Sequence, residues 1–440
     1  MRILLLNQFF WPDAARTGEL LADLAQRLVD DGCSVTVVCG RSPYVQTRQT
    51  EMASVQVLRA PVLPFRKGIS ARVLSYFSYL LLALWHSFRQ ARPDIVVTLT
   101  TPPLLSVIGA LAKRLRGCRH IIWEMDVYPD VAVDLGVLRP DSWLTRVLTA
   151  IANTARRRAD GIIVLGNCMR QRLIDQGISA EKIHVVENWA DGELIRARAP
   201  KSRNGTLSVL YSGNLGRAHD VETICAVMEK LKDDERFHFT FAGFGGRRPG
   251  LQDFCTRRGI PNVSFQPYCE REELGDVLAG ADIGLVTQRA ECLGALVPSK
   301  IYGLMAAARP ILFIGPRKST ADQVLSRHDC GWQVDCGDAD SAVNLLLNFA
   351  ESPDVLRHAG ERGHRAFLHE YDRHIGTARI AAILGVALPA RARAVAASAA
   401  SNGKNGHFAP SNGNGHINGI PKKPNGHVGT GRVWQSKSES

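Results

Sequence analysis

Short apolar runs alternate with helix-period segments along the first part of the chain. Ile3–Leu6 is a continuous apolar run, the pattern of a strand covered on both faces. Leu20–Val29 has the spacing of an amphipathic helix, and Ser34–Cys39 follows as a second strand. Further strands and helices are predicted at Ile95–Leu99, Leu104–Leu115, His120–Trp123, Gly161–Leu165, Cys168–Gln176 and Ile183–Val186. This order predicts a doubly wound α/β sheet.

The pattern breaks near residue 188 and then restarts. Asn188–Gly205 mixes charged residues, Asn and Gly without periodicity, which predicts a linker. The alternation resumes at Ser208–Tyr211, Val221–Leu231, His238–Ala242, Val263–Phe265, Glu272–Leu278, Ile283–Val286 and Ile311–Ile314. The sequence therefore predicts two Rossmann-like doubly wound domains that face a central cleft, with ligands at the carboxyl ends of the strands.

The domain boundaries follow from these changes of pattern. We place the first domain at residues 1–190, the second at 205–370, and a C-terminal helix that packs back on the first domain at 371–388. Residues 389–440 are rich in Ala, Ser, Asn, Gly, Lys and His. This composition cannot bury a core, so it predicts a disordered tail.

The composition is that of a soluble globular protein with a basic surface. A net charge of +12 indicates an acidic partner. The basic residues are dispersed and form no recognised nucleic-acid module, so we do not expect nucleic acid. The ten cysteines form no CxxC pair, which favours free thiols in a reducing cytosol. The N-terminal apolar run is too short for a signal peptide, so we expect a cytoplasmic protein.

The segment Pro298–Pro310 predicts a short helix with an unusual charge at its start. Ser299 is a favourable N-cap, and Pro310 prevents continuation of the helix. Lys300 would lie in the first turn, where the helix dipole disfavours a cation unless an anion binds there. Gly303 leaves room for a ligand to approach the helix. The segment predicts a phosphate site, and the alternative is an exposed lysine on an ordinary helix.

The first predicted strand of the second domain ends in a glycine-rich turn. Gly213 and Gly216 flank Asn214 there and expose backbone N–H groups, while Arg217 and His219 supply positive charge. The turn predicts a diphosphate site.

A second glycine-rich turn contains Gly243 and Gly245, which either let a nucleotide approach the backbone or only turn the chain. The turn lacks the GxGxxG spacing with its acidic partner, so we do not expect a nicotinamide cofactor. Tyr268, after the next strand, is a candidate for flanking a base.

Two carboxylates follow a buried strand of the first domain. Glu124 and Asp126 lie on the expected ligand edge, where a carboxylate is costly unless it is solvated or paired. Either one is a candidate for orienting an acceptor hydroxyl or acting as a base. The alternative is that they cap the following turn. The sequence shows no cluster of metal ligands, so we expect no metal.

The apolar run Val73–His86 is too short to span a bilayer. Its aromatic residues, among them Trp85, and its basic flank of Arg66, Lys67 and Arg72 favour a helix lying at a membrane interface. The alternative is a helix half buried in the first domain. Both descriptions can hold for different faces of one helix.

Together these motifs resemble the family 4 glycosyltransferases, which have the GT-B fold. The similarity spans about residues 1–385, and the nearest group resembles bacterial enzymes that assemble O-antigen and colanic-acid-like polysaccharides. The motifs that carry it are Asn7–Pro12, Thr17–Glu19, Asp126–Asp130, Gly213–Gly216 and Pro298–Gly303.

The resemblance implies a retaining hexosyl- or N-acetylhexosaminyltransferase that uses a nucleotide diphosphate donor, expected to be a UDP-sugar. The second domain would hold the donor, together with Gly18 of the first. A lipid-linked or glycan acceptor would approach the first domain at the inner face of the cell membrane. Cationic side chains and a helix dipole would stabilise the leaving diphosphate without a metal.

The chain departs from the family pattern at several positions. The family has paired glutamates eight positions apart, and here Ala295 and Gly303 occupy those positions, with Glu291 as a nearby candidate. Asn214 stands where arginine is common, and His219 stands where lysine is common. A sugar-nucleotide epimerase of GT-B fold and a non-catalytic binding member of a polysaccharide assembly complex therefore remain open.

Overall fold

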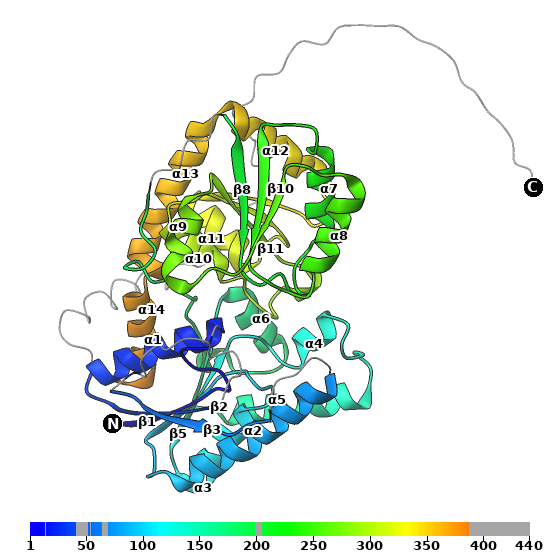
Figure 1. Ribbon diagram of the computed structural model, residues 1–440. Helices are drawn as coiled ribbons and strands as arrows, with labels where there is room; N and C mark the ends of the chain where they lie inside the picture. The colour runs from blue at the N-terminus through cyan, green and yellow to red at the C-terminus, as the bar shows by residue number, and fades with distance from the viewer. Residues whose placement is uncertain (14, 41–51, 53, 64–68, 199–204, 387–440) are drawn as a thin grey trace, which may run out of the picture. The chain divides into compact units, whose positions relative to one another are not determined.

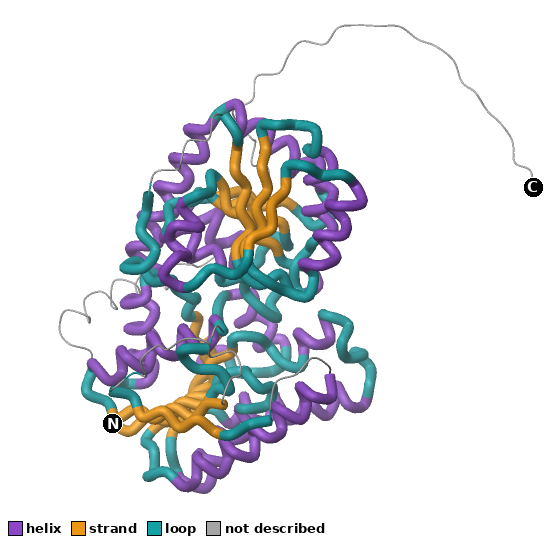
Figure 2. Tube along the Cα trace, in the orientation of Figure 1, coloured by secondary structure: helices purple, strands orange, loops and turns teal. Residues whose placement is uncertain are grey.

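The computed structural model describes residues 1–386, except for 14, 41–51, 53, 64–68 and 199–204. In this part of the chain the strands form two parallel sheets, each covered by helices (Figures 1 and 2). The predicted pair of Rossmann-like domains is therefore confirmed. Arg66, Lys67 and residues 389–440, for which the sequence makes predictions, lie outside the described residues.

The first sheet has the order β3-β2-β1-β4-β5-β6-β7. Its strands are β1 (Arg2–Leu6), β2 (Ser34–Gly40), β3 (Gln56–Ala60), β4 (Ile95–Thr98), β5 (Arg119–Glu124), β6 (Gly161–Val164) and β7 (Ile183–Val185). Its helices are α1 (Arg16–Asp30), α2 (Ile69–Arg89), α3 (Ser106–Arg116), α4 (Asp130–Asp134), α5 (Trp143–Arg158) and α6 (Asn167–Asp175), with the 3-10 turn η1 (Ala180–Lys182). The order reverses between β1 and β4, so a ligand site is expected at the ends of these strands.

The alternation of side chains along β1 explains how both faces of this sheet are covered. Ile3 and Leu5 point to one face and join the core that α1 completes. Leu4 and Leu6 point to the other face, where Tyr79 of α2 and residues of α3 pack. A continuous apolar strand is therefore required at this position.

The second sheet has the order β10-β9-β8-β11-β12-β13. Its strands are β8 (Leu207–Ser212), β9 (Phe237–Ala242), β10 (Val263–Gln266), β11 (Ile283–Thr287), β12 (Ile311–Ile314) and β13 (Gly331–Val334). Its helices are α7 (Glu222–Lys230), α8 (Arg248–Arg258), α9 (Leu274–Ala279), α10 (Lys300–Ala306), α11 (Thr320–His328), α12 (Ala339–Glu351) and α13 (Pro353–Ala366). The 3-10 turns η2 (Arg271–Glu273) and η3 (Ala290–Cys292) and the π-helical segment η4 (Phe367–Tyr371) complete it.

The hydrophobic pattern missed β3 and β13. The sequence of β3, Gln-Val-Leu-Arg-Ala, lies at the edge of its sheet and is mostly half buried, so it has no continuous apolar run. Strand β13 is four residues long and also lies at an edge. Short edge strands carry little periodic signal, because only part of each side of the strand is covered.

Helix α14 (Arg373–Leu384) packs against α1 after the chain leaves the second domain. Ile380, Ala381 and Leu384 belong to the same hydrophobic core as β1 and α1. Arg119 of β5 also donates a 2.9 Å hydrogen bond to the carbonyl of Leu384. The C-terminal helix thus contributes apolar surface to the first domain.

The start of the predicted linker is a packed part of the structure. Trp189 is 1% exposed and stacks on Trp123, with 5.6 Å between ring centroids. The Trp189 indole N–H donates to Asp23 at 2.9 Å, and Ala190 forms a bridge with Asp372. The absence of periodicity therefore hid a segment that tertiary contacts fix in place.

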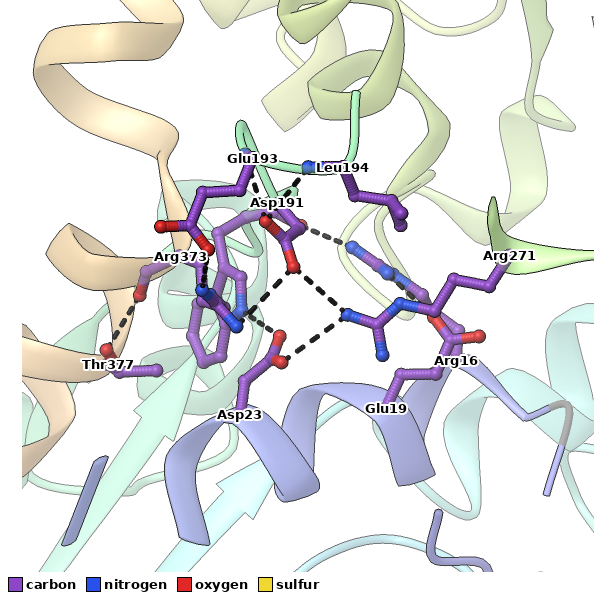
Figure 3. Close-up of polar contacts among 10 residues, drawn as sticks. Arg16, Glu19, Asp23, Asp191, Glu193, Leu194, Arg271, Arg373 and Thr377 are labelled. Atoms are coloured by element: carbon purple, nitrogen blue, oxygen red, sulfur yellow. Dashed lines mark hydrogen bonds and ion pairs between the residues drawn. The ribbon is translucent and has the colours of Figure 1, made fainter. Parts of the chain in front are cut away.

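Charged side chains join the two domains beside α1 (Figure 3). Arg271 of η2 lies 3.3 Å from the Asp191 carboxylate and 3.6 Å from the Asp23 carboxylate. Arg373 lies 3.5 Å from Asp191 on its other side. Burial raises the pKa of the Asp23 carboxyl, while the hydrogen bond from Trp189 and the charge of Arg271 oppose this rise. These contacts connect α1, the segment after β7, η2 and α14.

The burial of Trp189 gives a first prediction. Replacing Trp189 by Ala should lower the free energy of unfolding by about 3–5 kcal/mol, because a large buried side chain is lost and a cavity remains. The matched control is Trp143→Ala, since Trp143 is 75% exposed and its loss should change stability by less than about 0.5 kcal/mol. Urea denaturation followed by circular dichroism measures both. Equal losses would contradict the packing of Trp189.

Candidate functional site

Main-chain pairing connects the carboxyl edges of the two sheets. Asp126, which follows β5, forms an antiparallel bridge with Leu296, which follows β11 and η3. The backbone N–H of Val127 donates to the carbonyl of Ala295 at 2.8 Å. Ala295, in one of the family's glutamate positions, is fully buried at this contact. The segments expected to carry ligands in the two domains therefore lie against each other.

Asp126 has the properties of a functional carboxylate. Its side chain is half buried and makes no side-chain hydrogen bond to the described residues. Burial, with a smaller contribution from the charge of Glu124, raises its pKa to about 6. Burial also raises the pKa of the Tyr128 hydroxyl, and Asp126 and Tyr76 of α2 add to that rise. Asp126 is thus still ionised at neutral pH. Its neighbours include Tyr128 and, through Tyr128, Tyr76 of α2.

Glu124 has a structural role in place of the predicted catalytic one. Its carboxylate accepts a 2.7 Å hydrogen bond from Arg156, and both side chains are almost fully buried. Arg156 also donates to Asn153 at 2.8 Å and to the carbonyl of Tyr128 at 2.9 Å. Removing either member of this buried ion pair would leave an uncompensated charge. The pair holds α5 against the end of β5.

The helix that begins after Ser299 differs from its prediction. Helix α10 is seven residues long, the backbone of Ser299 is already helical, and its side chain makes no capping hydrogen bond. Ser299 therefore lies at the predicted N-cap position, but it does not cap the helix through its side chain. A Cβ on Gly303 would lie 3.6 Å from Leu278 and 3.8 Å from Ile195, so this glycine faces the core.

Lys300 lies directly over the turn that follows β8. Its ammonium donates to the carbonyl of Asn214 at 3.3 Å and lies 5.1 Å from the centroid of the Tyr211 ring. Gly213 has a φ of +116°, which favours glycine, and a Cβ there would lie 3.0 Å from Cε of Lys300. Burial lowers the pKa of Lys300 to about 8. The structure thus brings together two motifs that are far apart in the sequence.

His219 does not supply the positive charge that the sequence suggested. Its Nδ1 lies 2.8 Å from the carbonyl of Thr287, and since a carbonyl only accepts, Nδ1 carries the proton. Burial lowers its pKa to about 3, with the charge of Lys300 acting in the same direction. Arg217 is exposed and has no side-chain partner among the described residues. The cations of this turn are therefore Lys300 and Arg217.

The predicted glycines of the two turns pack against each other. A Cβ on Gly243 would lie 2.3 Å from the carbonyl oxygen of Gly213, and one on Gly245 would lie 2.3 Å from that of Leu215. Both Gly243 and Gly245 have positive φ, of +127° and +139°. These glycines are required by contact between the turns. Gly216 has no comparably close neighbour and remains open for a ligand.

The other predicted donor residues have separate positions. Tyr268 is 42% exposed and lies against Phe244, with 5.5 Å between ring centroids. Glu291 in η3 is exposed, and its hydrogen bond from Arg289 lowers its pKa. In α1, a Cβ on Gly18 would lie 3.1 Å from the backbone of Phe10, so glycine lets the preceding loop approach the helix. Because Glu291 is exposed, it does not take the place of the glutamate that the family has at the buried position of Ala295.

Helix α2 is buried on one face and exposed on the other. Val73, Leu74, Phe77, Leu81 and Trp85 are between 52% and 59% exposed. The opposite face is buried in the core of the first domain. The guanidinium of Arg89 lies 5.5 Å from the Trp85 ring, while the side chain of Arg72 is outside the description. Within the described residues, no helix is both long enough and apolar enough to cross a membrane.

Gln288 is a candidate positioning residue that the sequence analysis missed. It follows β11 directly and is 1% exposed. Its side-chain amide donates to the carbonyl of Cys292 at 3.0 Å and to that of Leu296 at 3.3 Å. It thereby closes the loop that pairs with Asp126. Its place at the reversal of strand order, between β8 and β11, is the signal that could have identified it.

The contact between the glycine turns gives a second prediction. Gly245→Ala should lower the free energy of unfolding by at least about 1–3 kcal/mol, because it combines a positive φ with a clash against backbone. Gly246→Ala is the matched control, since a Cβ at that position has nothing within 4 Å. Thermal denaturation of both variants measures the difference. Equal stability of the two variants would contradict the packing of the turns.

Two family models match successive parts of the chain. Residues 17–189 match the model described as a glycosyl transferase 4-like domain. Residues 195–366 match the model described as glycosyl transferases group 1. The first matched segment contains all strands of the first sheet except β1, and the second contains all strands of the second sheet.

Individual relatives agree with these models. The chain is 24% identical over 367 residues to the probable glycosyltransferase WbjE of Pseudomonas aeruginosa, covering 80% of this chain and 90% of WbjE. It is 24% identical over 333 residues to the putative colanic acid biosynthesis glycosyl transferase WcaI of Escherichia coli strain K12, covering 70% and 81%. HepE of Anabaena, solved in complex with UDP-glucose, shares the fold with a TM-score of 0.66 at 14% identity, over 88% of this chain and 100% of HepE.

Proposed function

The chain belongs to the glycosyltransferases with a GT-B fold, since it combines a glycosyl transferase 4-like domain with a group 1 domain, and we propose that it transfers a sugar from a nucleotide diphosphate to an acceptor in polysaccharide biosynthesis. The observation that carries this proposal is the placement of Lys300 over the turn at Gly213 and Asn214. An ammonium at the carboxyl end of β8, beside the reversal of strand order, is suited to a diphosphate.

The donor would bind at this turn. Lys300 and the exposed Arg217 supply two positive charges, and the glycine turn supplies backbone N–H groups. Both cations would stabilise the diphosphate as it leaves, so we propose a reaction that needs no metal. The complexes of HepE with UDP and with UDP-glucose support a UDP-sugar as the donor. We further propose transfer of a hexosyl or N-acetylhexosaminyl group with retention of configuration.

The acceptor would bind on the first domain beside Asp126. This carboxylate is half buried, without a hydrogen-bonding partner among the described residues, and ionised at neutral pH. It can accept the proton of an acceptor hydroxyl as that hydroxyl attacks the donor sugar. Tyr76 of α2 raises the pKa of the Tyr128 hydroxyl, which places this site next to α2.

We propose a lipid-linked or glycan acceptor at the cytoplasmic face of the cell membrane. The exposed apolar stripe of α2 has the character of an interfacial helix. The name of the relative WcaI, a putative colanic acid biosynthesis glycosyl transferase, supports a role in polysaccharide biosynthesis.

The donor site gives a third prediction. Lys300→Ala should weaken UDP binding by about 1.5–3 kcal/mol, the usual contribution of a hydrogen bond to a charged group. Since the pKa of Lys300 is lowered to about 8, UDP binding to the unaltered protein should weaken as pH rises above that value. The variant should lose this pH dependence. Calorimetry from pH 7 to 9 measures both effects.

The control for this experiment is Lys230→Ala. Lys230 is an exposed lysine of the same domain, paired with Asp340 at the surface. This variant should bind UDP as the unaltered protein does. Unchanged UDP affinity in Lys300→Ala would exclude the proposed role of Lys300.

The acceptor site gives a fourth prediction. Asp126→Asn should lower kcat by about 10²–10⁴-fold, the usual contribution of a general base, while UDP affinity is retained. Because the pKa of Asp126 is raised to about 6, the activity of the unaltered protein should fall as pH decreases below that value and the carboxylate is protonated. Sugar transfer from UDP-sugars to a membrane extract measures kcat.

Asp233→Asn changes an exposed carboxylate of the second domain and should leave kcat unchanged. Full activity of Asp126→Asn would remove Asp126 from the mechanism. Conversion of the UDP-sugar to its epimer without any acceptor would instead show that the protein is an epimerase.

A further inference from the structure

Helices α2, α3 and α5 form one layer on the same face of the first sheet. Helix α3 packs against both α2 and α5, and Figure 1 shows α2 and α3 side by side beneath this sheet. More than half of the exposed large hydrophobic residues of the described chain lie on these helices. They are Val73, Leu74, Phe77, Leu81 and Trp85 on α2, Val107 and Leu115 on α3, and Trp143, Leu144, Val147 and Ile151 on α5.

The exposed large hydrophobic residues of α5 form a second apolar stripe, separate from that of α2. Trp143, Leu144, Val147 and Ile151 follow the spacing i, i+1, i+4 and i+8, which places them on one side of a helix. They are between 39% and 75% exposed. The other side of α5 carries Arg156, which is buried with Glu124. The outer side of α5 therefore combines large apolar side chains with the exposed Arg146, Arg157 and Arg158.

The same layer is strongly basic. The sequences of α2, α3 and α5 contain no Asp or Glu. Five arginines of these helices are exposed without an ion pair to the described residues, and these are Arg89, Arg114, Arg146, Arg157 and Arg158. On the other face of the sheet, α1 carries Glu19, Asp23 and Asp30. The three helices of this layer thus lack acidic residues, whereas α1 on the other face carries three.

We infer that α5 is a second lipid-inserting helix and that α2, α3 and α5 together dock on an anionic bilayer. Amphipathic helices with an aromatic residue near one end and cationic neighbours bind at the interface of such a bilayer. This inference rests on the proposed function, because it specifies how the protein would reach a membrane-linked acceptor. A second copy of the chain is the less suitable occupant, because self-association through this face would bring like charges together.

Two inserted helices would fix the orientation of the first domain. A single helix can rotate about its own axis in the interface, whereas α2 and α5, held apart by α3, define a plane. Tyr76 of α2 and Asp126 both raise the pKa of the Tyr128 hydroxyl, so the proposed acceptor site lies next to α2. The docked face would thus hold the acceptor site at a constant distance from the lipid.

The test is co-sedimentation of the full chain with vesicles at low salt. One set of vesicles contains phosphatidylcholine with 30 mol% phosphatidylglycerol, chosen as about the anionic content that attracts cationic segments, and the other contains phosphatidylcholine alone. The α5 variant is Trp143→Ala with Val147→Ala, and the α2 variant is Phe77→Ala with Leu81→Ala. The control variant, Val355→Ala with Leu368→Ala, removes exposed hydrophobic residues from the second domain.

We expect the α5 and α2 variants each to lose about tenfold or more in affinity for the anionic vesicles, with the control unchanged. Arg146→Gln with Arg157→Gln should reduce binding to the anionic vesicles only, and should flatten its dependence on salt. UDP binding by calorimetry should be unchanged in every variant, which shows that each is folded.

Retention of the α5 variant on anionic vesicles at the affinity of the unaltered protein would overturn the role of α5. A protein that binds no vesicles, but whose dimer dissociates in the α5 variant, would show that the face joins two copies. Vesicle binding without any sugar transfer would refute the proposed function and leave the docking face intact. Sugar transfer to a soluble acceptor without vesicle binding would refute the docking face and leave the proposed glycosyltransferase activity intact.

Discussion

The hydrogen bond from the Val127 N–H to the Ala295 carbonyl, with the bridge between Asp126 and Leu296, is the constraint on which the candidate site depends. Backbone pairing fixes register, so the end of β5 cannot shift against the segment between β11 and α10 without losing this bond. That segment ends at Lys300. The contacts of Arg271 with Asp23 and Asp191 hold the domains together at a second place. The proposed donor and acceptor residues are therefore parts of one framework.

Burial and ion pairing give residues of similar charge near this contact different protonation behaviour. Glu124 and Asp126 are two positions apart, yet Glu124 is neutralised by Arg156 whereas Asp126 has no such partner and its pKa rises to about 6. Lys300 and His219 are both close to the turn after β8. Burial leaves Lys300 mostly charged at neutral pH, with a pKa of about 8, and His219 neutral, with a pKa of about 3. The chemistry follows from which groups are desolvated and which are paired.

The two faces of the first sheet differ in the charge and polarity of the helices that cover them. Helices α1 and α14 cover one face, and α1 contributes carboxylates to the junction with η2. Helices α2 and α3 cover the other, and with α5 they form a layer that is apolar and basic on its outer side. One face thus holds the domains together, and the other is suited to a lipid surface. Both are built on strands whose side chains alternate between them.

The sequence alone determined the fold class, because apolar runs such as Ile3–Leu6 and periodic segments such as Leu20–Val29 are local properties of the chain. It also located Gly213 and Lys300 as motifs, since turn and helix signals are local as well. It could not decide that Ser299 makes no cap, that His219 is neutral or that Trp189 is buried. Those outcomes depend on partners far away in the sequence, as with Trp189 and Asp23, or Lys300 and Asn214. Desolvation and pairing arise only when such residues meet, so only the tertiary structure could decide them.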